Sequence, residues 1–295
     1  MRVLLTGGTG YIGSATLDAL VAAEHDVTCL IRDRSRRRRI EERGGRPAAG
    51  DVTDAAAVRA LAGAVDGVVH LASPGDDTSA HVDAAFTDAV LTGLAGTGKA
   101  FVSTGGVWDH GSGDDITESS PFRPPRISAW GPAITERVRA ATGVRTAVIA
   151  PALVYGRGDN LLTLVSAGPR RGAGDDEALV VPGGGDQHWP TVHVDDLADL
   201  YVQALENAPA GSYFIGASGV NPTAGEITRA ASRALGLDGR IALDGLAATV
   251  GRLGALGEAL LLDQRASGDG ARRVLGWRPG RPTVLDHLAE TVGRC

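Results

Sequence analysis

The chain has 295 residues, 43% of them hydrophobic and 22% charged, which is enough apolar sequence for a sizeable core and excludes wholesale disorder. The formal net charge of −6 argues against a nucleic-acid-binding protein, because such proteins usually carry a basic surface. Cys29 and Cys295 form neither a disulfide framework nor a zinc-ligand pair, and no apolar run approaches the ~18 residues of a membrane helix. We therefore expect a reduced, cytoplasmic protein that binds neither nucleic acid nor membrane and holds no metal.

Short apolar runs alternate with helix-like stretches through the first half of the chain. This alternation is typical of a parallel sheet with helices on both faces, and its spacing predicts a doubly wound α/β fold. The expected strands are residues 2–5, 27–31, 67–71, 100–103 and 146–150. The expected helices are residues 12–23, 55–61, 81–94 and 133–141.

The alternation weakens after Tyr155, where we place the end of the first domain. Residues 190–216 contain a strand pattern and then a helix pattern, which we expect to return to the sheet. Residues 224–295 are mostly helical with glycine breaks, as in a small cap over a pocket. The sequence thus predicts a sheet domain over residues 1–155 and a capping region over residues 156–295.

A glycine-rich segment joins the first expected strand to the first expected helix. Its residues are Gly7, Gly8, Thr9, Gly10, Tyr11, Ile12 and Gly13. Glycines let the chain turn tightly and let backbone N–H groups approach a pyrophosphate, while the helix N-terminus adds partial positive charge. The alternative is a purely structural turn. The position between a strand and a helix favours a dinucleotide-binding loop.

Arg32 follows the second expected strand, nineteen residues after Gly13, where such folds contact the adenosine ribose. An arginine there suits the 2′-phosphate of NADP, and a charge-assisted hydrogen bond contributes about 1.5–3 kcal/mol. The neighbouring Asp33 leaves NAD as the alternative, because a carboxylate binds the ribose hydroxyls. The arginine run at residues 36–39 raises the local potential for an extra phosphate. We expect NADP(H) to be preferred over NAD(H).

Several motifs together resemble the extended or atypical short-chain dehydrogenase/reductase superfamily, in particular its NAD-dependent epimerase/dehydratase-like members. These motifs are residues 7–13, Arg32, residues 51–54, 70–72, 154–156, 192–196 and 271–279. The resemblance implies a Rossmann domain, a small substrate-capping domain and a nicotinamide cofactor lying across the strand ends. It also implies that Asp51 and Val52 flank the adenine, and that Leu71 and Ala72 lie along the ribose and pyrophosphate.

The catalytic pair of that superfamily, Tyr-x-x-x-Lys, is missing from this chain. None of the four tyrosines is followed by lysine four residues later, and the only lysine is Lys99. By position, Trp130 replaces the tyrosine and Ile134 the lysine. An indole N–H is no acid at neutral pH, and a positioned general acid typically contributes 10²–10⁴-fold to the rate. Another group must therefore move the proton, or the reaction needs none at that place.

Three residues are candidates for catalysis at the strand ends. Thr104 matches the superfamily's Ser/Thr position and would bind a substrate oxygen, unless its hydroxyl bonds the backbone instead. His110, with its neighbour Asp109, is a candidate proton donor, and the alternative is a solvated loop histidine. Tyr155 could reach the pocket, and the alternative role, packing of the cap, is favoured for it.

Three functions remain open at this point. The first is an NAD(P)-binding oxidoreductase acting on a small-molecule carbonyl or alcohol. The second is a non-redox enzyme on the same scaffold, such as a dehydratase, cyclase or isomerase, as the missing Tyr/Lys pair suggests. The third is a non-catalytic NAD(P)-binding redox sensor. The partner is a small-molecule substrate in the first two, and a homodimer is the candidate assembly.

Overall fold

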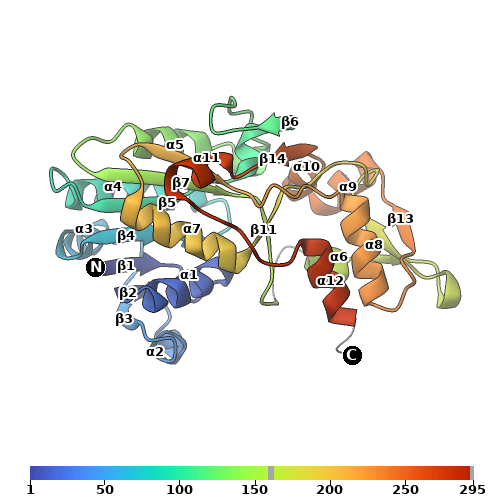
Figure 1. Ribbon diagram of the computed structural model, residues 1–295, viewed down its shortest axis with the longest axis horizontal. Coiled ribbons are helices and arrows are strands. Elements are labelled where there is room, and N and C mark those ends of the chain that lie inside the picture. Colours follow the sequence, from blue (N-terminus) through green and yellow to red (C-terminus); the bar gives the residue numbers. More distant parts are fainter. Residues whose placement is uncertain (159–162, 293–295) are drawn as a thin grey trace.

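The computed structural model describes residues 1–158 and 163–292, and its centre is a seven-stranded parallel sheet (Figure 1). In spatial order the strands are β12 (Ser212–Gly216), β7 (Arg145–Pro151), β5 (Ala100–Thr104), β4 (Gly67–His70), β1 (Arg2–Thr6), β2 (Asp26–Ile31) and β3 (Arg46–Ala49). Every neighbouring pair is parallel. The predicted doubly wound Rossmann sheet is therefore confirmed.

Helices cover both faces of this sheet. Helices α1 (Tyr11–Ala22) and α7 (Val194–Asn207) pack together on one face, and α3 (Ala55–Ala64), α4 (Ser79–Gly93) and α5 (Gly131–Arg139) pack on the other. The short α2 (Arg37–Glu41) lies beside β3 at the sheet edge. Consecutive strand residues are buried because both faces are covered, which explains the unbroken apolar runs in the sequence.

The strand order reverses between β1 and β4. From β1 the chain adds β2 and β3 on one side, and then crosses to β4 and the remaining strands on the other. In open α/β sheets the crevice outside the carboxyl ends of the strands at such a switch point is the usual ligand site. The glycine-rich segment leaves β1 at this place.

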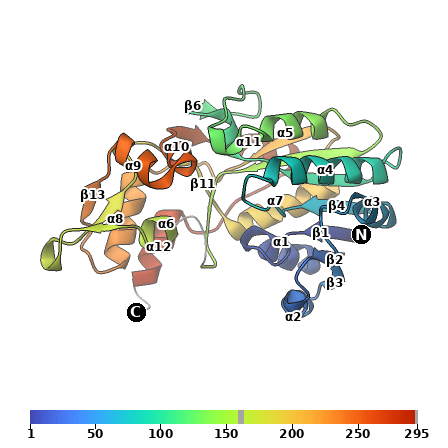
Figure 2. The same cartoon turned by 180° about the vertical axis from the view of Figure 1, so that it is seen from behind.

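The second domain has its own hydrophobic core, which includes Trp189, Leu179, Ile227 and Leu260. The strands are β9 (Arg170–Arg171), β10 (Ala178–Val181) and β13 (Ile241–Leu243), and the helices are α6 (Thr163–Ser166), α8 (Ala224–Ala234), α9 (Leu246–Leu253), α10 (Ala255–Leu260) and α12 (Val284–Val292). Seen from behind, these elements form a body beside the sheet domain (Figure 2). The expectation of a mostly helical cap missed the three-stranded sheet β13-β10-β9.

The chain passes between the two domains more than once. Strand β11 (Thr191–His193) pairs with β8 (Leu153–Tyr155) in a small separate sheet, so β11 itself does not join the main sheet, while α7 and β12, also within residues 190–216, pack on the sheet and belong to it. The residues that do join it are those of β12, after α7.

A later segment also comes back to the sheet domain. Strand β14 (Gln264–Ala266) pairs with β6 (Gly113–Ile116), and α11 (Asp269–Leu275) packs on α7 and β12. The indole of Trp277 is buried in the main core and donates a hydrogen bond to the Asp196 carbonyl at 2.7 Å. The capping region is therefore interrupted by two stretches that belong to the sheet domain.

Candidate active site

The glycine-rich loop closes so tightly that a side chain is excluded at Gly7 and at Gly13. Gly7 has φ +73°, and a Cβ there would lie 2.6 Å from the Leu71 carbonyl. A Cβ on Gly13 would overlap the Gly7 carbonyl oxygen. Gly10 N–H donates to that same oxygen at 2.8 Å and completes the turn. The loop thus leaves an open backbone cradle, which fits the close approach of a dinucleotide pyrophosphate.

The N-terminus of α1 faces this cradle. Gly10 occupies the N-cap, where no side chain caps the helix, and the first turn contains no acidic residue. The positive end of the helix is therefore not neutralised by its own sequence. The Tyr11 hydroxyl donates to the Gly156 carbonyl at 2.7 Å and fixes the helix start against the loop after β8. The structure thus brings together the expected loop residues Gly7, Gly10, Tyr11, Ile12 and Gly13.

Two arginines lie at the end of β2. Arg32 follows the strand directly and is exposed. Arg36 donates to the Thr9 hydroxyl of the glycine loop at 3.4 Å, so its guanidinium reaches the cradle. The Asp33 carboxylate accepts from Ser35 N–H at 2.9 Å and pairs with Arg36, and the hydrogen bond from Ser35 holds the pKa of Asp33 below its usual range. Asp33 therefore serves the turn after β2.

Asp51 and Val52 follow β3, the next strand outward. The Asp51 carboxylate accepts from both the backbone N–H and the hydroxyl of Thr53, at 2.9 and 2.8 Å, and these bonds lower its pKa. Val52 is partly buried against the main core. Both residues thus lie at the strand ends, as the expected adenine contacts require.

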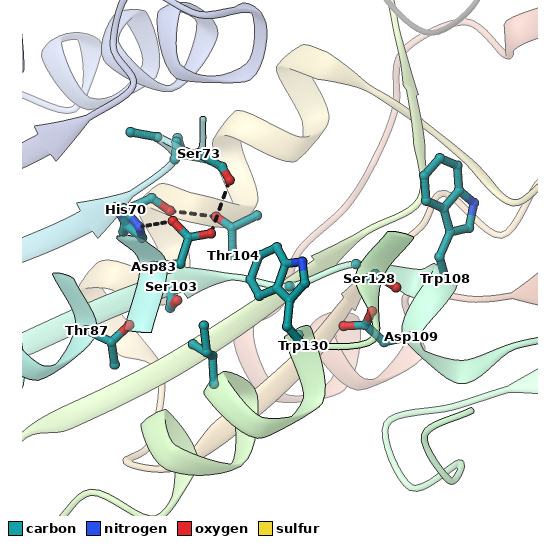
Figure 3. A pocket seen from close by; sticks show the side chains of 16 residues that line it. His70, Ser73, Asp83, Thr87, Ser103, Thr104, Trp108, Asp109, Ser128 and Trp130 are labelled. Atoms are coloured by element: carbon teal, nitrogen blue, oxygen red, sulfur yellow. Dashed lines mark hydrogen bonds and ion pairs between the residues drawn. The ribbon is translucent and has the colours of Figure 1, made fainter. Parts of the chain in front are cut away.

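Leu71 and Ala72 connect the glycine loop with a cavity. Their N–H groups both donate to the Thr6 hydroxyl at 3.2 Å, which holds the segment after β4 beside the end of β1. On one side they contact Gly7, and on the other they line a cavity of about 280 Å³ at the carboxyl ends of β4 and β5, which we call the strand-end cavity. Other side chains around it are His70, Ser73, Asp83, Thr87, Ser103, Thr104, Trp108, Asp109, Ser128, Trp130 and Ile134 (Figure 3).

The Thr104 hydroxyl has no proton left for a substrate. Its O–H donates to the His70 carbonyl at 2.7 Å, and it accepts from the Tyr201 hydroxyl of α7 at 2.8 Å. A hydroxyl has one proton and two lone pairs, so only one acceptor position remains. Thr104 lines the cavity as expected, but it can accept a hydrogen bond from a substrate hydroxyl and cannot donate one to a carbonyl.

Trp130 and Ile134 both line the strand-end cavity, at and just inside the start of α5. They form an apolar wall at the place where the short-chain superfamily is expected to carry tyrosine and lysine. Lys99 cannot substitute, because it precedes β5 at the opposite edge of the sheet and donates to the Gly63 carbonyl at 3.0 Å.

His110 does not reach the strand-end cavity, contrary to the expectation for a proton donor. It is 3% exposed, its Nδ1 donates to the Ser120 carbonyl at 3.1 Å, and its Nε2 lies 3.0 Å from the Tyr213 hydroxyl. Burial lowers its pKa. The ring is therefore a neutral, fully hydrogen-bonded part of the core.

Tyr155 is likewise absent from the cavity lining. Its hydroxyl donates to the Pro282 carbonyl at 2.7 Å, and its ring belongs to the core of the second domain. Burial raises its pKa. This placement fits the alternative role of packing the cap.

Asp109 does line the cavity, although no pattern in the sequence favours it over His110. It is 2% exposed, its Oδ1 has no hydrogen-bond partner, and burial raises its pKa to about 6. Figure 3 shows its carboxyl beside Ser128 and Trp130. Gly131 leaves room for it, because a Cβ there would lie 2.8 Å from Asp109 Oδ2.

A second polar group on the cavity wall was missed in the sequence. His70 Nε2 lies 3.5 Å from Asp83 Oδ1, and Ser73 donates to Asp83 Oδ2 at 3.1 Å (Figure 3). His70 also stacks on Phe86 and bonds the Thr6 hydroxyl through Nδ1 at 2.7 Å. The available signal was Asp83 itself, a carboxylate three residues before Phe86 on the buried stripe of α4.

No helix within residues 1–158 and 163–292 is long and apolar enough to cross a membrane. Among the same residues, no three His, Cys, Asp or Glu side chains gather in a way that could hold a metal ion.

Comparison with known proteins places the chain among relatives of similar length. A family model described as NAD dependent epimerase/dehydratase family matches residues 3–216. The uncharacterised protein C2A9.02 of Schizosaccharomyces pombe is 28% identical over 98% of this chain and 99% of its own length. The 2-alkyl-3-oxoalkanoate reductase of Stenotrophomonas maltophilia is 27% identical over 72% of this chain and 67% of its own.

The fold also matches solved structures along nearly its whole length. A dTDP-glucose 4,6-dehydratase from Streptomyces venezuelae, solved with NAD bound, superposes with a TM-score of 0.77. The match covers 99% of this chain and 96% of that one at 24% sequence identity. At this identity the likeness establishes the shared fold.

Proposed function

Since the chain belongs to the NAD dependent epimerase/dehydratase family, we propose that it is an NAD(P)-binding oxidoreductase that acts on a small-molecule carbonyl or alcohol. The observation that carries this proposal is the continuity between the glycine cradle and the strand-end cavity. Leu71 and Ala72 border both, so a ligand with its pyrophosphate at the cradle extends directly into the cavity. A bound nicotinamide dinucleotide would supply hydride transfer there.

NADP(H) is the preferred cofactor in this proposal. Arg36 supplies positive charge beside the loop residue Thr9, Arg32 stands exposed at the end of β2, and Asp33 is turned to the backbone of its own turn. Two guanidinium groups bind the 2′-phosphate of NADP more strongly than the uncharged 2′-hydroxyl of NAD.

The substrate in this proposal is small and uncharged. The strand-end cavity of about 280 Å³ is lined by no lysine or arginine, and Trp130 and Ile134 make one wall apolar. A substrate with a phosphate or carboxylate would find no cation there. A ketone or aldehyde of modest size, or the matching alcohol, suits these walls better. The Stenotrophomonas relative is named as the reductase of a 3-oxo carboxylate, so it shares the reduction of a carbonyl, but its substrate carries a carboxylate that this cavity does not match.

A fluorescence titration of cofactor-stripped protein with NADPH and, in parallel, NADH tests the first half of the proposal. We expect micromolar binding of NADPH and weaker binding of NADH. A panel of neutral carbonyl compounds then tests the second half, with NADPH consumption followed by absorbance. If neither dinucleotide bound, the proposed oxidoreductase function would be wrong.

A non-redox enzyme on the same scaffold is the second candidate, and one observation favours it. Trp130 and Ile134 remove the tyrosine and lysine with which the short-chain superfamily is expected to move a proton during hydride transfer. A dehydratase, cyclase or isomerase would convert its substrate without net change in nicotinamide absorbance. Following substrate and absorbance in the same reaction separates the two candidates.

A further inference from the structure

Three titratable side chains line the strand-end cavity, namely His70, Asp83 and Asp109. The first two face each other, with 3.5 Å between Nε2 and Oδ1, and Ser73 donates to the second oxygen of Asp83. Asp109 lies apart from this pair, on the 3₁₀ helix Val107–His110 that follows β5. Its Oδ1 is buried without a hydrogen-bond partner. Asp83 Oδ1 also lacks a hydrogen bond, but it faces the His70 ring, whereas Asp109 has no such partner among the described residues that line the cavity.

We propose that Asp109 is the catalytic acid–base residue of the strand-end cavity and takes the place of the absent tyrosine. This inference rests on the oxidoreductase function proposed above. In the reductive direction, a bound reduced nicotinamide dinucleotide would supply a hydride to the carbonyl carbon, and the π pair of the C=O bond would move to oxygen. That oxygen takes the proton of the Asp109 carboxyl, which leaves an alcohol and a carboxylate. Water then reprotonates Asp109, and alcohol oxidation runs through the same steps in reverse.

The surroundings of Asp109 keep its carboxyl protonated up to a higher pH than the carboxyl of an exposed aspartate. Burial raises its pKa to about 6, against the smaller opposing effects of the Ser128 hydroxyl and the Gly106 backbone. Within the described part of the chain, no cationic side chain is among the groups that shift this pKa. The adjacent His110 has a lowered pKa, Tyr213 of β12 has a raised one, and both are neutral near pH 7. A general acid works best with a pKa near the working pH, which this carboxyl meets.

The other polar groups nearby are less suited to this role. The Thr104 proton is donated to the His70 carbonyl, and both His110 ring nitrogens have partners in the core. The indole N–H of Trp130 does not ionise near neutral pH. Asp109 is the one of these four that can both give and take a proton inside the cavity.

The first test is a ¹³C NMR titration of the aspartate carboxyls in the cofactor-free protein, repeated with saturating NADPH and with saturating NADP⁺. We expect one carboxyl to titrate near pH 6, and its signal to disappear in the isosteric variant Asp109→Asn. The control variant Asp115→Asn removes an exposed carboxylate of β6 and should leave that signal in place. The acid dissociation constant of this carboxyl should be at least threefold larger with NADP⁺ bound than with NADPH bound. The reason is that the cationic nicotinamide ring of NADP⁺ in the same cavity favours the carboxylate.

The second test is kinetic and uses the best carbonyl substrate of the panel. Asp109→Asn should lower kcat by about 10²–10⁴-fold, with KM for NADPH changed less than threefold. In the parent protein kcat for reduction should fall as the pH rises above about 6, and this dependence should vanish in the variant. Asp109→Ala provides a second side chain without an acid, in case the amide disturbs folding.

The outcomes separate the two proposals. If NADPH binds but the carboxyl titrates identically with NADP⁺ and NADPH, Asp109 does not face the cofactor and the inference is overturned while the cofactor assignment stands. Retention of more than a tenth of kcat in Asp109→Asn would overturn it as well. If fluorescence shows that neither dinucleotide binds, the oxidoreductase function itself fails, and the catalytic role of Asp109 falls with it.

Discussion

The cradle and the strand-end cavity lie at the carboxyl edge of the same sheet, yet they differ in what they retain. The cradle keeps the glycines and the uncapped helix start that a dinucleotide needs, and the cavity has lost the expected tyrosine and lysine. The cradle acts through backbone geometry, which a single Cβ would block. The cavity acts through side chains, so a carboxyl on a different element can take over the task of a lost hydroxyl.

The strongest test of the cradle is Gly13→Ala. The new Cβ would overlap the Gly7 carbonyl, so the loop must open and NADPH binding should weaken at least 100-fold by fluorescence titration. Gly251→Ala is the matched control, because its Cβ meets nothing within 4 Å and the residue lies exposed in α9. Tight binding in Gly13→Ala would remove the cradle from the site.

The charge beside the cradle is tested by Arg32→Ala. Loss of one charge-assisted hydrogen bond to a 2′-phosphate should weaken NADPH about ten- to a hundred-fold and leave NADH within about threefold. Arg170→Ala removes an exposed arginine of the second domain that pairs with Glu177 and should change neither. Equal losses for both dinucleotides would contradict a 2′-phosphate contact.

The cavity can be examined without substrate through the stability of Asp109→Asn. The pKa of Asp109 is about 6 when folded against 3.8 for the free group, so folding takes up a proton between these values and the parent loses stability as the pH rises from about 4 through 6. The difference corresponds to about 3 kcal/mol. Urea unfolding should find the variant comparatively more stable at pH 8 than at pH 4. If the difference in unfolding free energy between parent and variant were the same at pH 4 and pH 8, folding would not raise the pKa of this carboxyl.

Thr104→Val should act on stability more than on chemistry. The change leaves the buried Tyr201 hydroxyl without its acceptor and should lower the free energy of unfolding by about 1–3 kcal/mol. Adding Tyr201→Phe removes the orphaned group and should restore part of that loss. A selective collapse of kcat with unchanged stability would instead give Thr104 a direct role.

The smallest effect is expected for Trp130→Phe. The indole provides an apolar wall to the cavity, and phenylalanine preserves most of it, so kcat should stay within about threefold. A hundredfold loss would assign a specific function to the indole N–H.

The same contrast explains what the sequence could and could not predict. The buried strands are visible because Val3, Leu4 and Leu5 form an unbroken apolar run, and the loop is visible because its glycines serve local geometry. Strand β3 was missed because Arg46 and Pro47, on the sheet edge, give no apolar signal.

The identity of the proton donor could not be predicted, because it depends on contacts far apart in the sequence. Asp109 and His110 are neighbours on one short helix, but Gly131 leaves room for the first at the cavity and Tyr213 holds the second in the core. No local pattern distinguishes two adjacent polar residues whose surroundings come from α5 and β12.

The return of β14, α11 and Trp277 to the sheet domain has an evolutionary consequence. A capping domain encoded as one uninterrupted block could be exchanged whole between genes by recombination. Here the block is split by stretches that complete the sheet domain's own packing, so such an exchange would break both cores at once. New specificity in this architecture must therefore accumulate by point substitutions and loop changes within an inherited frame.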